Sequence, residues 1–348
     1  MRNNTNKINV VFFDAKPYDI EEFKKYNNDN FQIKFLETKL TKDTFELAKG
    51  ADVVCVFVND DVNKYVIDKL YELDVKLIAL RCAGYNNVDI EYCFNKIHVV
   101  HVPAYSPYAV AEHAMALLLT SIRRIHKAYN RTKDFNFSLN GLTGFELHNK
   151  TIGVVGTGKI GKIFIDICRG FGMKIIAYDK YPSVNNVEYV TFDEILLQSD
   201  IISFHCPLTP ETHHIINTET IKKLKDGVVI INTSRGALID SEAMLEGIKA
   251  RKIGAACLDV YEEESDIFFN DFSGHIVDDD ILARLISMPN VIVTSHQAFL
   301  TSEALKNIAE TTINNIKDII ENNFSENELC YHCGNIEHCK KERKQRCF

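Results

Sequence analysis

Glycines in one short segment have the spacing of a turn that binds phosphates. Residues 151–161 read TIGVVGTGKIG, in which Gly156, Gly158 and Gly161 follow a strand-like run and precede a helix-like one. In that setting they allow a tight turn, close approach of a pyrophosphate and close packing of the helix on the strand. The phosphates would bind the free N–H groups at the helix N-terminus, where the dipole favours anions. The segment therefore predicts a dinucleotide site.

An acidic residue follows at the end of the next strand-like run. Asp179 lies 18 residues after Gly161, where a carboxylate can accept hydrogen bonds from the ribose hydroxyls and repel a 2′-phosphate. The sequence thus favours NAD over NADP. The alternative is a loop glycine cluster beside an unrelated surface aspartate.

Two further strand ends carry groups suited to an organic acid. Arg235 lies in NTSRGALID (residues 232–240), and its planar guanidinium can hold a carboxylate in two parallel hydrogen bonds. His296 lies in VIVTSHQAF (residues 291–299), between a strand-like and a helix-like run. The structural alternatives are an arginine that caps a helix or pairs at the surface, and a histidine that only packs.

An acidic run supplies candidate partners for the histidine. The segment LDVYEEESDIFF places Asp259 at a strand end and then Glu262, Glu263 and Glu264 in a row. The pattern does not choose among the three glutamates, and a solvated loop is the alternative. A carboxylate beside His296 would raise the imidazole pKa by ~1–3 units and make it a proton donor near neutral pH.

Two series of alternating strand-like and helix-like runs must position these groups. Short runs rich in Val, Ile and Phe are typical of strands buried on both faces of a parallel sheet. Their alternation with helices predicts an α/β fold of open, doubly wound sheets. The predicted strands are 8–13, 31–36, 53–58, 77–80, 98–102, 151–155, 174–177, 201–204, 228–232, 255–258 and 291–294. The predicted helices are 20–26, 42–49, 62–72, 107–129, 159–171, 241–250 and 302–322.

Composition narrows the class of protein. The 348 residues, 46% hydrophobic and 25% charged, fit two globular domains. Apolar runs are too short for a membrane span or a signal peptide. A net charge of −8 argues against general nucleic-acid binding. Six dispersed cysteines are expected to be reduced, buried thiols of a cytosolic protein: Cys55, Cys82, Cys93, Cys168, Cys206 and Cys257.

The last 19 residues differ from the rest of the chain. Cys330, Cys333, Cys339 and Cys347 crowd together there, and residues 340–346 carry five basic and one acidic side chain. Thiolates at this C-x2-C-x5-C-x7-C spacing could hold Zn²⁺ tetrahedrally. An iron–sulfur cluster, a thiol switch and an unliganded tail are the alternatives.

Several blocks in the same order resemble a known family. From about residue 8 to 329 the sequence is similar to NAD-dependent D-2-hydroxyacid dehydrogenases, above all the bacterial fermentative enzymes that act on D-lactate. The matching stretches are LRCAGYNNVD, VPAYSPYAVAEHA, SLNGLTGFEL, GVVGTGKIGK, HCPLTPET, NTSRGALIDS, DVYEEESDIFF and SHQAFLT. The resemblance implies a flavodoxin-like substrate domain (1–103 and 300–329), an inserted Rossmann-type NAD domain (104–299), and an extension at 330–348.

The resemblance also implies residue roles. Arg235 would bind the substrate carboxylate, His296 would exchange a proton with the substrate oxygen, and Glu264 would pair with His296. The remaining substrate contacts would come from backbone N–H groups around Ala83 and Gly84, and from Tyr105 and Phe299. NAD would be contacted by Gly156, Gly158, Lys159, Ile160, Gly161, Asp179, Cys206, Pro207, Thr212, Thr233, Ser234, Arg235 and Asp259.

The activity implied is the reversible reduction of pyruvate to D-lactate with NADH, with domain closure about hinges near residues 102–105 and 298–300. Alternatives are a bulkier 2-keto acid, a phosphoglycerate substrate, which is weaker because the length leaves no room for a regulatory domain, or an NADH-sensing corepressor-like protein. A homo-oligomer, dimer or tetramer, is expected through residues 107–129 and 130–149, with no nucleic-acid or membrane partner.

Overall fold

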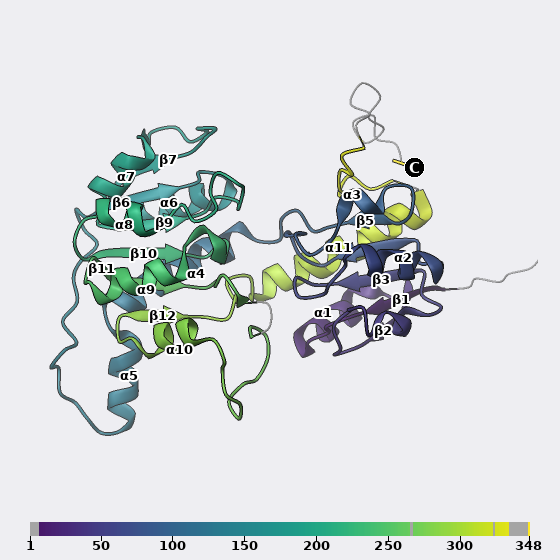
Figure 1. The fold of residues 1–348 in the computed structure, drawn as a ribbon, viewed down its shortest axis with the longest axis horizontal. Coiled ribbons are helices and arrows are strands. Elements are labelled where there is room, and N and C mark those ends of the chain that lie inside the picture. Colours follow the sequence, from purple (N-terminus) through teal and green to yellow (C-terminus); the bar gives the residue numbers. More distant parts are fainter. Residues whose placement is uncertain (1–6, 265–266, 323, 334–346) are drawn as a thin grey trace, which may run out of the picture. The chain divides into compact units, whose positions relative to one another are not determined.

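The computed structural model describes residues 7–264, 267–322, 324–333 and 347–348 (Figure 1). The chain divides into two compact units. Unit 1 comprises Met1–Ser106 and Thr301–Phe348, and unit 2 comprises Pro107–Leu300. Each unit is built on one parallel sheet covered by helices, which confirms the predicted α/β fold class.

Unit 1 has a flavodoxin-like sheet. Its five parallel strands lie in the order β2-β1-β3-β4-β5, so the order reverses between β1 and β3, where such folds bind ligands. The strands are β1 (Ile8–Phe12), β2 (Phe31–Phe35), β3 (Val53–Val56), β4 (Leu77–Leu80) and β5 (His98–Val100). The helices are α1 (Pro17–Asn27), η1 (Phe45–Ala48, a 3-10 turn), α2 (Lys64–Glu72), α3 (Ile90–Cys93) and α11 (Ser302–Asn322).

The last long helix returns to unit 1. α11 packs against α1, β4 and β5 and buries an apolar stripe that includes Ile308, Ile313 and Ile316. In Figure 1 its yellow-green ribbon lies among the purple and blue elements of this unit. Its residues show helical spacing in the sequence, but spacing does not say which sheet they cover.

A buried cation lies beyond the carboxyl ends of the unit 1 strands. Arg81 is 1% exposed, and its guanidinium lies 4.4 Å from the ring centre of Phe12 and 4.6 Å from that of Phe57. It donates to the Asp14 carbonyl (2.7 Å) and lies 3.5 Å from the carboxylate of Asp19.

A second buried acid belongs to the same cluster. The carboxylate of Asp60 accepts hydrogen bonds from the backbone N–H groups of Leu40 and Phe57, both at 2.6 Å. Burial raises the pKa of Asp60 to about 6, although Arg81 and the two N–H groups act in the opposite direction. Arg81 is thus the positive charge that allows these acids to be buried.

Arg81→Met should therefore destabilise unit 1. Removing one member of a buried ionic cluster leaves uncompensated charge and costs about 3–5 kcal/mol in the free energy of unfolding, which urea denaturation would measure. The matched control is Arg284→Met on an exposed turn of α10 (Asp280–Ser287), expected within about 0.5 kcal/mol of wild type. Equal stability of the two variants would contradict the assignment.

Unit 2 has a Rossmann-type sheet. Its seven parallel strands lie in the order β12-β11-β10-β9-β6-β7-β8, with the reversal between β6 and β9. The strands are β6 (Thr151–Val155), β7 (Lys174–Tyr178), β8 (Glu188–Tyr189), β9 (Ile201–Phe204), β10 (Val228–Asn232), β11 (Ile253–Leu258) and β12 (Val291–Val293). The helices, besides α10, are α4 (Pro107–Ile122), α5 (Ile125–Lys133), α6 (Lys159–Gly170), α7 (Phe192–Gln198), α8 (Thr218–Lys223), η2 (Gly236–Leu238, a 3-10 turn) and α9 (Ser241–Lys249).

Two predicted helices are wrong in detail. The single helix expected over residues 107–129 is two helices, α4 and α5, because Arg124 adopts a left-handed backbone (φ 55°) between them. The following chain passes so close to the end of α4 that a Cβ at Gly144 would lie 2.0 Å from the Ile122 carbonyl oxygen. The helix expected over 42–49 is the short 3-10 turn η1. At the break between α4 and α5, this close contact overrides the helical spacing of the sequence.

The chain beyond α11 packs onto unit 1. Glu328 is buried, and its Oε1 lies 2.6 Å from His98 Nδ1 and accepts a hydrogen bond from the Tyr331 hydroxyl (2.8 Å). The Phe348 ring stacks on His98 with 4.3 Å between ring centres. Cys330 and Cys333 are exposed, whereas Cys339 lies outside the described residues. No helix in the described ranges is both long and apolar enough to cross a membrane.

Candidate active site

The predicted site residues of unit 2 emerge from one edge of its sheet. Because all seven strands are parallel, their carboxyl ends meet at that edge. Gly156 follows β6, Asp179 follows β7, Cys206 follows β9, Arg235 follows β10, Asp259 and Glu264 follow β11, and His296 follows β12. The glycine turn and Cys206 follow the two strands at the reversal of strand order, and Arg235, Glu264 and His296 follow three successive strands on one side of it.

The glycine turn has the shape that a diphosphate needs. Gly156 has φ 93°, and a Cβ there would lie 2.6 Å from the Cys206 nitrogen. A Cβ at Gly161 would lie 2.0 Å from the Gly156 carbonyl oxygen, so both glycines are required by backbone packing. A Cβ at Gly158 would meet nothing within 4 Å. Gly158 precedes α6 without a side-chain cap, which leaves N–H groups for an anion.

Asp179 is held in place by a residue that the sequence analysis missed. Its Oδ2 accepts hydrogen bonds from the backbone N–H (2.6 Å) and the hydroxyl (3.0 Å) of Thr157, inside the glycine turn. The Thr157 hydroxyl also lies 2.9 Å from that of Tyr189. The pair fixes the carboxylate against the turn, where a ribose bound with its phosphates at α6 would lie. The threonine in the second position of GTGKIG was the available signal.

Among the other cofactor candidates, two hydroxyl groups already form hydrogen bonds within the protein, whereas a third has none in the described part of the chain. The Thr212 hydroxyl donates to the Pro207 carbonyl (2.8 Å), and Ser234 Oγ donates to the Phe204 carbonyl (2.9 Å). Thr233 Oγ1 is buried and has no hydrogen-bond partner within the described part of the chain. A buried hydroxyl without a partner is costly unless a ligand pairs with it. Together with the glycine turn, it fits a bound dinucleotide.

Burial keeps the Cys206 thiol protonated. This residue is half-buried, and burial raises its pKa to about 11. Lys159 is exposed at the start of α6, and Ile160 beside it is half-buried. Cys206 therefore packs beside the cofactor candidates as a protonated thiol and does not supply a reactive thiolate.

His296 contacts one member of the acidic run. Its Nδ1 lies 2.7 Å from Glu264 Oε1, and Glu264 Oε2 accepts a hydrogen bond from the Tyr261 N–H (2.9 Å). Glu262 instead contacts His214, and Glu263 is exposed. The three glutamates that the sequence pattern left equivalent therefore have three different surroundings.

Asp259 fixes the loop that carries His296. Its buried carboxylate accepts hydrogen bonds from the Thr294 hydroxyl (2.6 Å) and from the N–H groups of Gln297 and Ala298 (both 2.9 Å). Its carbonyl accepts the His296 N–H at 2.7 Å. These bonds hold His296 in a left-handed conformation (φ 53°), which costs about 1–3 kcal/mol in a non-glycine residue.

A histidine on α4 completes this arrangement. His113 Nε2 lies 3.2 Å from Asp259 Oδ1 and 3.2 Å from the Thr294 hydroxyl. Burial opposes ionisation of Asp259, but the hydrogen bonds from His113 and Thr294 outweigh it and lower the Asp259 pKa. The sequence analysis gave His113 and Thr294 no role, although His113 lies in the block AEHA.

Arg235 is half-buried beyond β10. The buried Asn232 donates from Nδ2 to the Arg235 carbonyl (2.8 Å), and Arg235 Nη1 donates to the Ser234 carbonyl (2.7 Å). One side of the guanidinium is thereby fixed, which leaves further N–H donors for a ligand.

The remaining substrate candidates lie in both units. Phe299 is buried in unit 2. In unit 1 the Ala83 carbonyl lies 3.0 Å from His101 Nδ1, the Gly84 carbonyl accepts from Cys82 Sγ (3.2 Å), and Asn307 donates to the Tyr105 carbonyl (2.6 Å). Ala83 and Gly84 thus follow β4 beside the buried Arg81.

This combination of a flavodoxin-like unit with a Rossmann-type unit and an Arg–Glu–His set defines a class of dinucleotide-dependent oxidoreductase. Residues 115–298 match the family model of the D-isomer-specific 2-hydroxyacid dehydrogenase NAD-binding domain. The chain is 47% identical over 328 residues to D-lactate dehydrogenase of Escherichia coli, an alignment that covers 92% of this chain and all of that protein.

Solved structures point to the same family. The pyruvate reductase of Chlamydomonas reinhardtii superposes with a TM-score of 0.86 at 43% identity, covering 91% of this chain and 97% of that one. D-lactate dehydrogenase of Aquifex aeolicus, solved with NAD and lactic acid, gives 0.80 at 34% identity, covering 90% and 96%. The chain belongs to the D-isomer-specific 2-hydroxyacid dehydrogenase family, and its cofactor is NAD.

Asp259→Asn should disturb the His296 loop and reduce activity. An amide keeps one acceptor oxygen but places an NH₂ group where the other oxygen accepted a backbone N–H, at about 1–3 kcal/mol of stability for the donor left unpaired. We expect kcat to fall at least about tenfold, because a well-aligned proton transfer usually raises the rate by more than that. Steady-state reduction of a 2-keto acid would measure it, with the exposed Asp226→Asn as control.

The same variant has a stability signature. Because the pKa of Asp259 is lowered in the folded protein, its contribution is present above the ordinary carboxyl pKa and is lost as the pH falls through the folded value. The difference in free energy of unfolding between wild type and Asp259→Asn should therefore shrink on acidification. A difference that stays constant with pH would contradict the lowered pKa.

Proposed function

We propose that the protein reduces pyruvate to D-lactate with NADH, reversibly, and that Arg235, Glu264 and His296 carry the reaction. The observation that supports this most directly is the 2.7 Å contact between His296 Nδ1 and Glu264 Oε1, with Arg235 on the same sheet edge. The names of the E. coli, Chlamydomonas and Aquifex relatives point to the same substrate pair.

Each of the three residues has a distinct task in this proposal. Arg235 binds the substrate carboxylate through paired N–H groups and polarises the keto oxygen. The Glu264 carboxylate binds Nδ1 and orients the ring, so that His296 donates a proton from Nε2 to that oxygen and takes it back in the reverse reaction. Bound NADH supplies the hydride that reaches the carbonyl carbon. Backbone N–H groups near Ala83 and Gly84, with Tyr105 and Phe299, complete the substrate contacts.

His296→Gln should lower kcat/KM for pyruvate by about 10²–10⁴-fold, the usual contribution of a general acid. Glu264→Gln should lower it less, because the glutamine amide can still form a hydrogen bond with Nδ1 and hold the ring. Steady-state rates across pH would measure both. Full activity of His296→Gln at every pH would remove it from the mechanism.

The substrate range separates the competing functions. A bulkier branched or aromatic 2-keto acid is the alternative within the family, and an NADH-sensing protein without turnover is the alternative outside it. We expect kcat/KM to rank pyruvate above 2-ketoisocaproate and phenylpyruvate, and NADH above NADPH because Asp179 would repel a 2′-phosphate. A preference for phenylpyruvate would favour the first alternative, and NADH binding without turnover the second.

We also propose that two or more copies of the chain associate through α5 and the segment that follows it. No residue of α5 is buried, and Phe135, Phe137 and Leu139 are 84%, 71% and 80% exposed. Ile125 and Tyr129 on α5 are also more than half exposed. Apolar side chains gathered in this way mark an interface, and a second copy is the simplest partner of a metabolic enzyme.

The double variant Phe137→Glu, Leu139→Glu should lower the molecular mass measured by light scattering toward that of one chain, because charge is excluded from an apolar interface. The control is Ile276→Glu, an equally exposed residue elsewhere in unit 2 (86%). An unchanged mass in the double variant would place the interface elsewhere.

The buried thiols support a reducing, cytoplasmic location. Cys55, Cys93, Cys168 and Cys257 are buried, and burial raises the pKa of each thiol to about 12. They are held as small apolar side chains, as intracellular proteins use them.

A further inference from the structure

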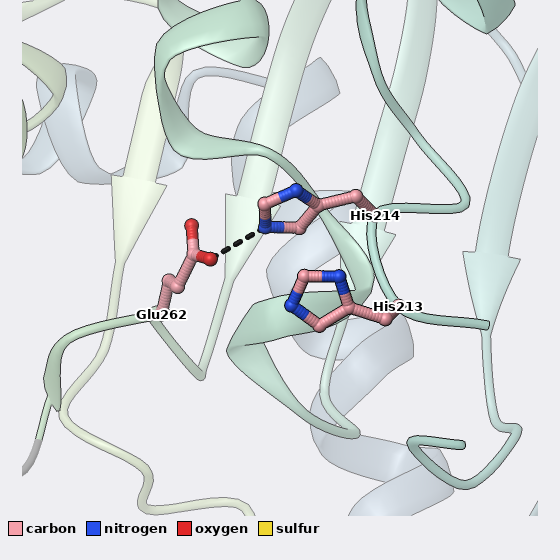
Figure 2. A group of neighbouring side chains, drawn as sticks. All are labelled: His213, His214 and Glu262. Atoms are coloured by element: carbon pink, nitrogen blue, oxygen red, sulfur yellow. Dashed lines mark hydrogen bonds and ion pairs between the residues drawn. The ribbon is translucent and has the colours of Figure 1, made fainter. Parts of the chain in front are cut away.

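Two adjacent histidines and a glutamate meet at a second place on the carboxyl edge of the unit 2 sheet. His213 and His214 lie in the segment between β9 and α8, and Glu262 follows β11. Figure 2 shows both imidazole rings with a nitrogen turned toward the Glu262 carboxylate. Within the ranges that the structure describes, no other group of three or more His, Cys, Asp or Glu side chains is close enough to share a metal ion.

We propose that His213, His214 and Glu262 form a binding site for a divalent transition-metal ion such as Zn²⁺, separate from the Arg235, Glu264 and His296 set. One ligand atom from each side chain lies within 4.8 Å of the other two. In a tetrahedral Zn²⁺ site with bonds of about 2.0–2.2 Å, the ligand atoms lie about 3.3–3.6 Å from each other. Binding an ion would therefore require the exposed His213 side chain to rotate toward the other two, and His214 and Glu262 to separate by about 1 Å.

Two of the ligands already lie side by side. His214 Nε2 lies 2.5 Å from Glu262 Oε1, so an ion would replace the proton that these two atoms share. Glu262 Oε2 accepts a hydrogen bond from Ser241 Oγ (3.2 Å), which orients the carboxylate with Oε1 toward the histidines. A hydrogen bond of this kind to a metal ligand commonly strengthens binding.

The backbone also holds the two sides of the site together. His214 has a left-handed backbone (φ 50°), its N–H donates to the Ala237 carbonyl (2.9 Å), and its carbonyl accepts from Asn217 Nδ2 (2.9 Å). On the other side, a Cβ at Gly236 would lie 2.4 Å from the Glu262 nitrogen, so a glycine there permits the close approach. The backbone of the site is thus in place before an ion binds, and only side chains have to move.

The third ligand needs an explanation that a simple ion pair does not supply. A His214–Glu262 pair would be complete without His213, whose ring instead stacks on His214 with 4.0 Å between centres. Once the His213 ring has turned out of this stack, both imidazoles can serve as neutral ligands of one cation. Imidazole and carboxylate together favour Zn²⁺, Ni²⁺ or Cu²⁺ over Mg²⁺ or Ca²⁺.

The bound ion would link two segments that matter for the proposed reaction. His213 directly follows Thr212, a predicted NAD contact, and Glu262 lies two residues before Glu264. The ion would therefore stabilise these strand-end segments against each other without contacting the substrate.

Calorimetric titration of the full-length protein with Zn²⁺ tests the site directly. The measurement uses a background in which the competing thiols are replaced by serine, namely Cys330, Cys333, Cys339 and Cys347. We expect one Zn²⁺ per chain. His213→Ala and Glu262→Gln should each bind it at least about tenfold more weakly, because losing even a hydrogen-bond partner of a metal ligand commonly lowers affinity that much. His275→Ala, which removes a single exposed histidine elsewhere in unit 2, should bind as the background does.

His213→Ala leaves the His214–Glu262 pair intact, so the variant should fold. Its thermal midpoint without metal should equal that of the background, and the rise in midpoint that Zn²⁺ produces in the background should be lost. No Zn²⁺ binding in the background, or unchanged affinity in His213→Ala, would overturn the site. Neither result depends on pyruvate turnover, so this test and that of the proposed reaction can fail independently.

Discussion

The carboxylate of Asp259 is the constraint on which the geometry of the proposed acid–base site depends. Asp259 directly follows β11, and its carboxylate accepts hydrogen bonds from the Thr294 hydroxyl and from two consecutive backbone N–H groups beyond β12. A single buried charge thereby sets the path of the neighbouring strand's loop. His296 can keep its left-handed backbone, and its ring can reach Glu264, because those hydrogen bonds outweigh the local strain.

Elsewhere on the same sheet edge, close backbone contacts at glycines position the loops. Gly156 and Gly161 bring β6, β9 and α6 together around the dinucleotide turn, and Gly236 brings the 3-10 turn η2 against the segment after β11. At each position a Cβ would overlap backbone atoms, so no side-chain adjustment could relieve the contact. These glycines determine where the strand-end loops lie, and the charged residues on those loops then determine what can bind.

The acidic run shows how one pattern is divided among several tasks. Glu264 contacts His296, Glu262 contacts His214, and Glu263 is exposed. In unit 1, by contrast, Arg81 holds its acids in the protein interior, where their burial has to be compensated by the guanidinium. Charge thus serves the proposed chemistry in unit 2 and the packing of strand ends in unit 1.

Much of this was determined by the sequence itself. Apolar strand runs alternating with helical spacing specify two parallel sheets, because such strands must be buried on both faces. The glycine spacing after β6 and the acid after β7 specify a dinucleotide turn, because backbone geometry and charge act locally there. The position of Arg235, Glu264 and His296 on one sheet edge follows from their places after parallel strands.

Tertiary structure decided what depends on contacts between distant segments. It divided the helix expected over 107–129 at Arg124, placed α11 on unit 1, and gave each glutamate of the acidic run different surroundings. It also joined His113 and Thr294 to Asp259, and His213 and His214 to Glu262. Residues so far apart in the chain come together only when the strands have paired, so their spacing in the sequence does not reveal how close they lie in space.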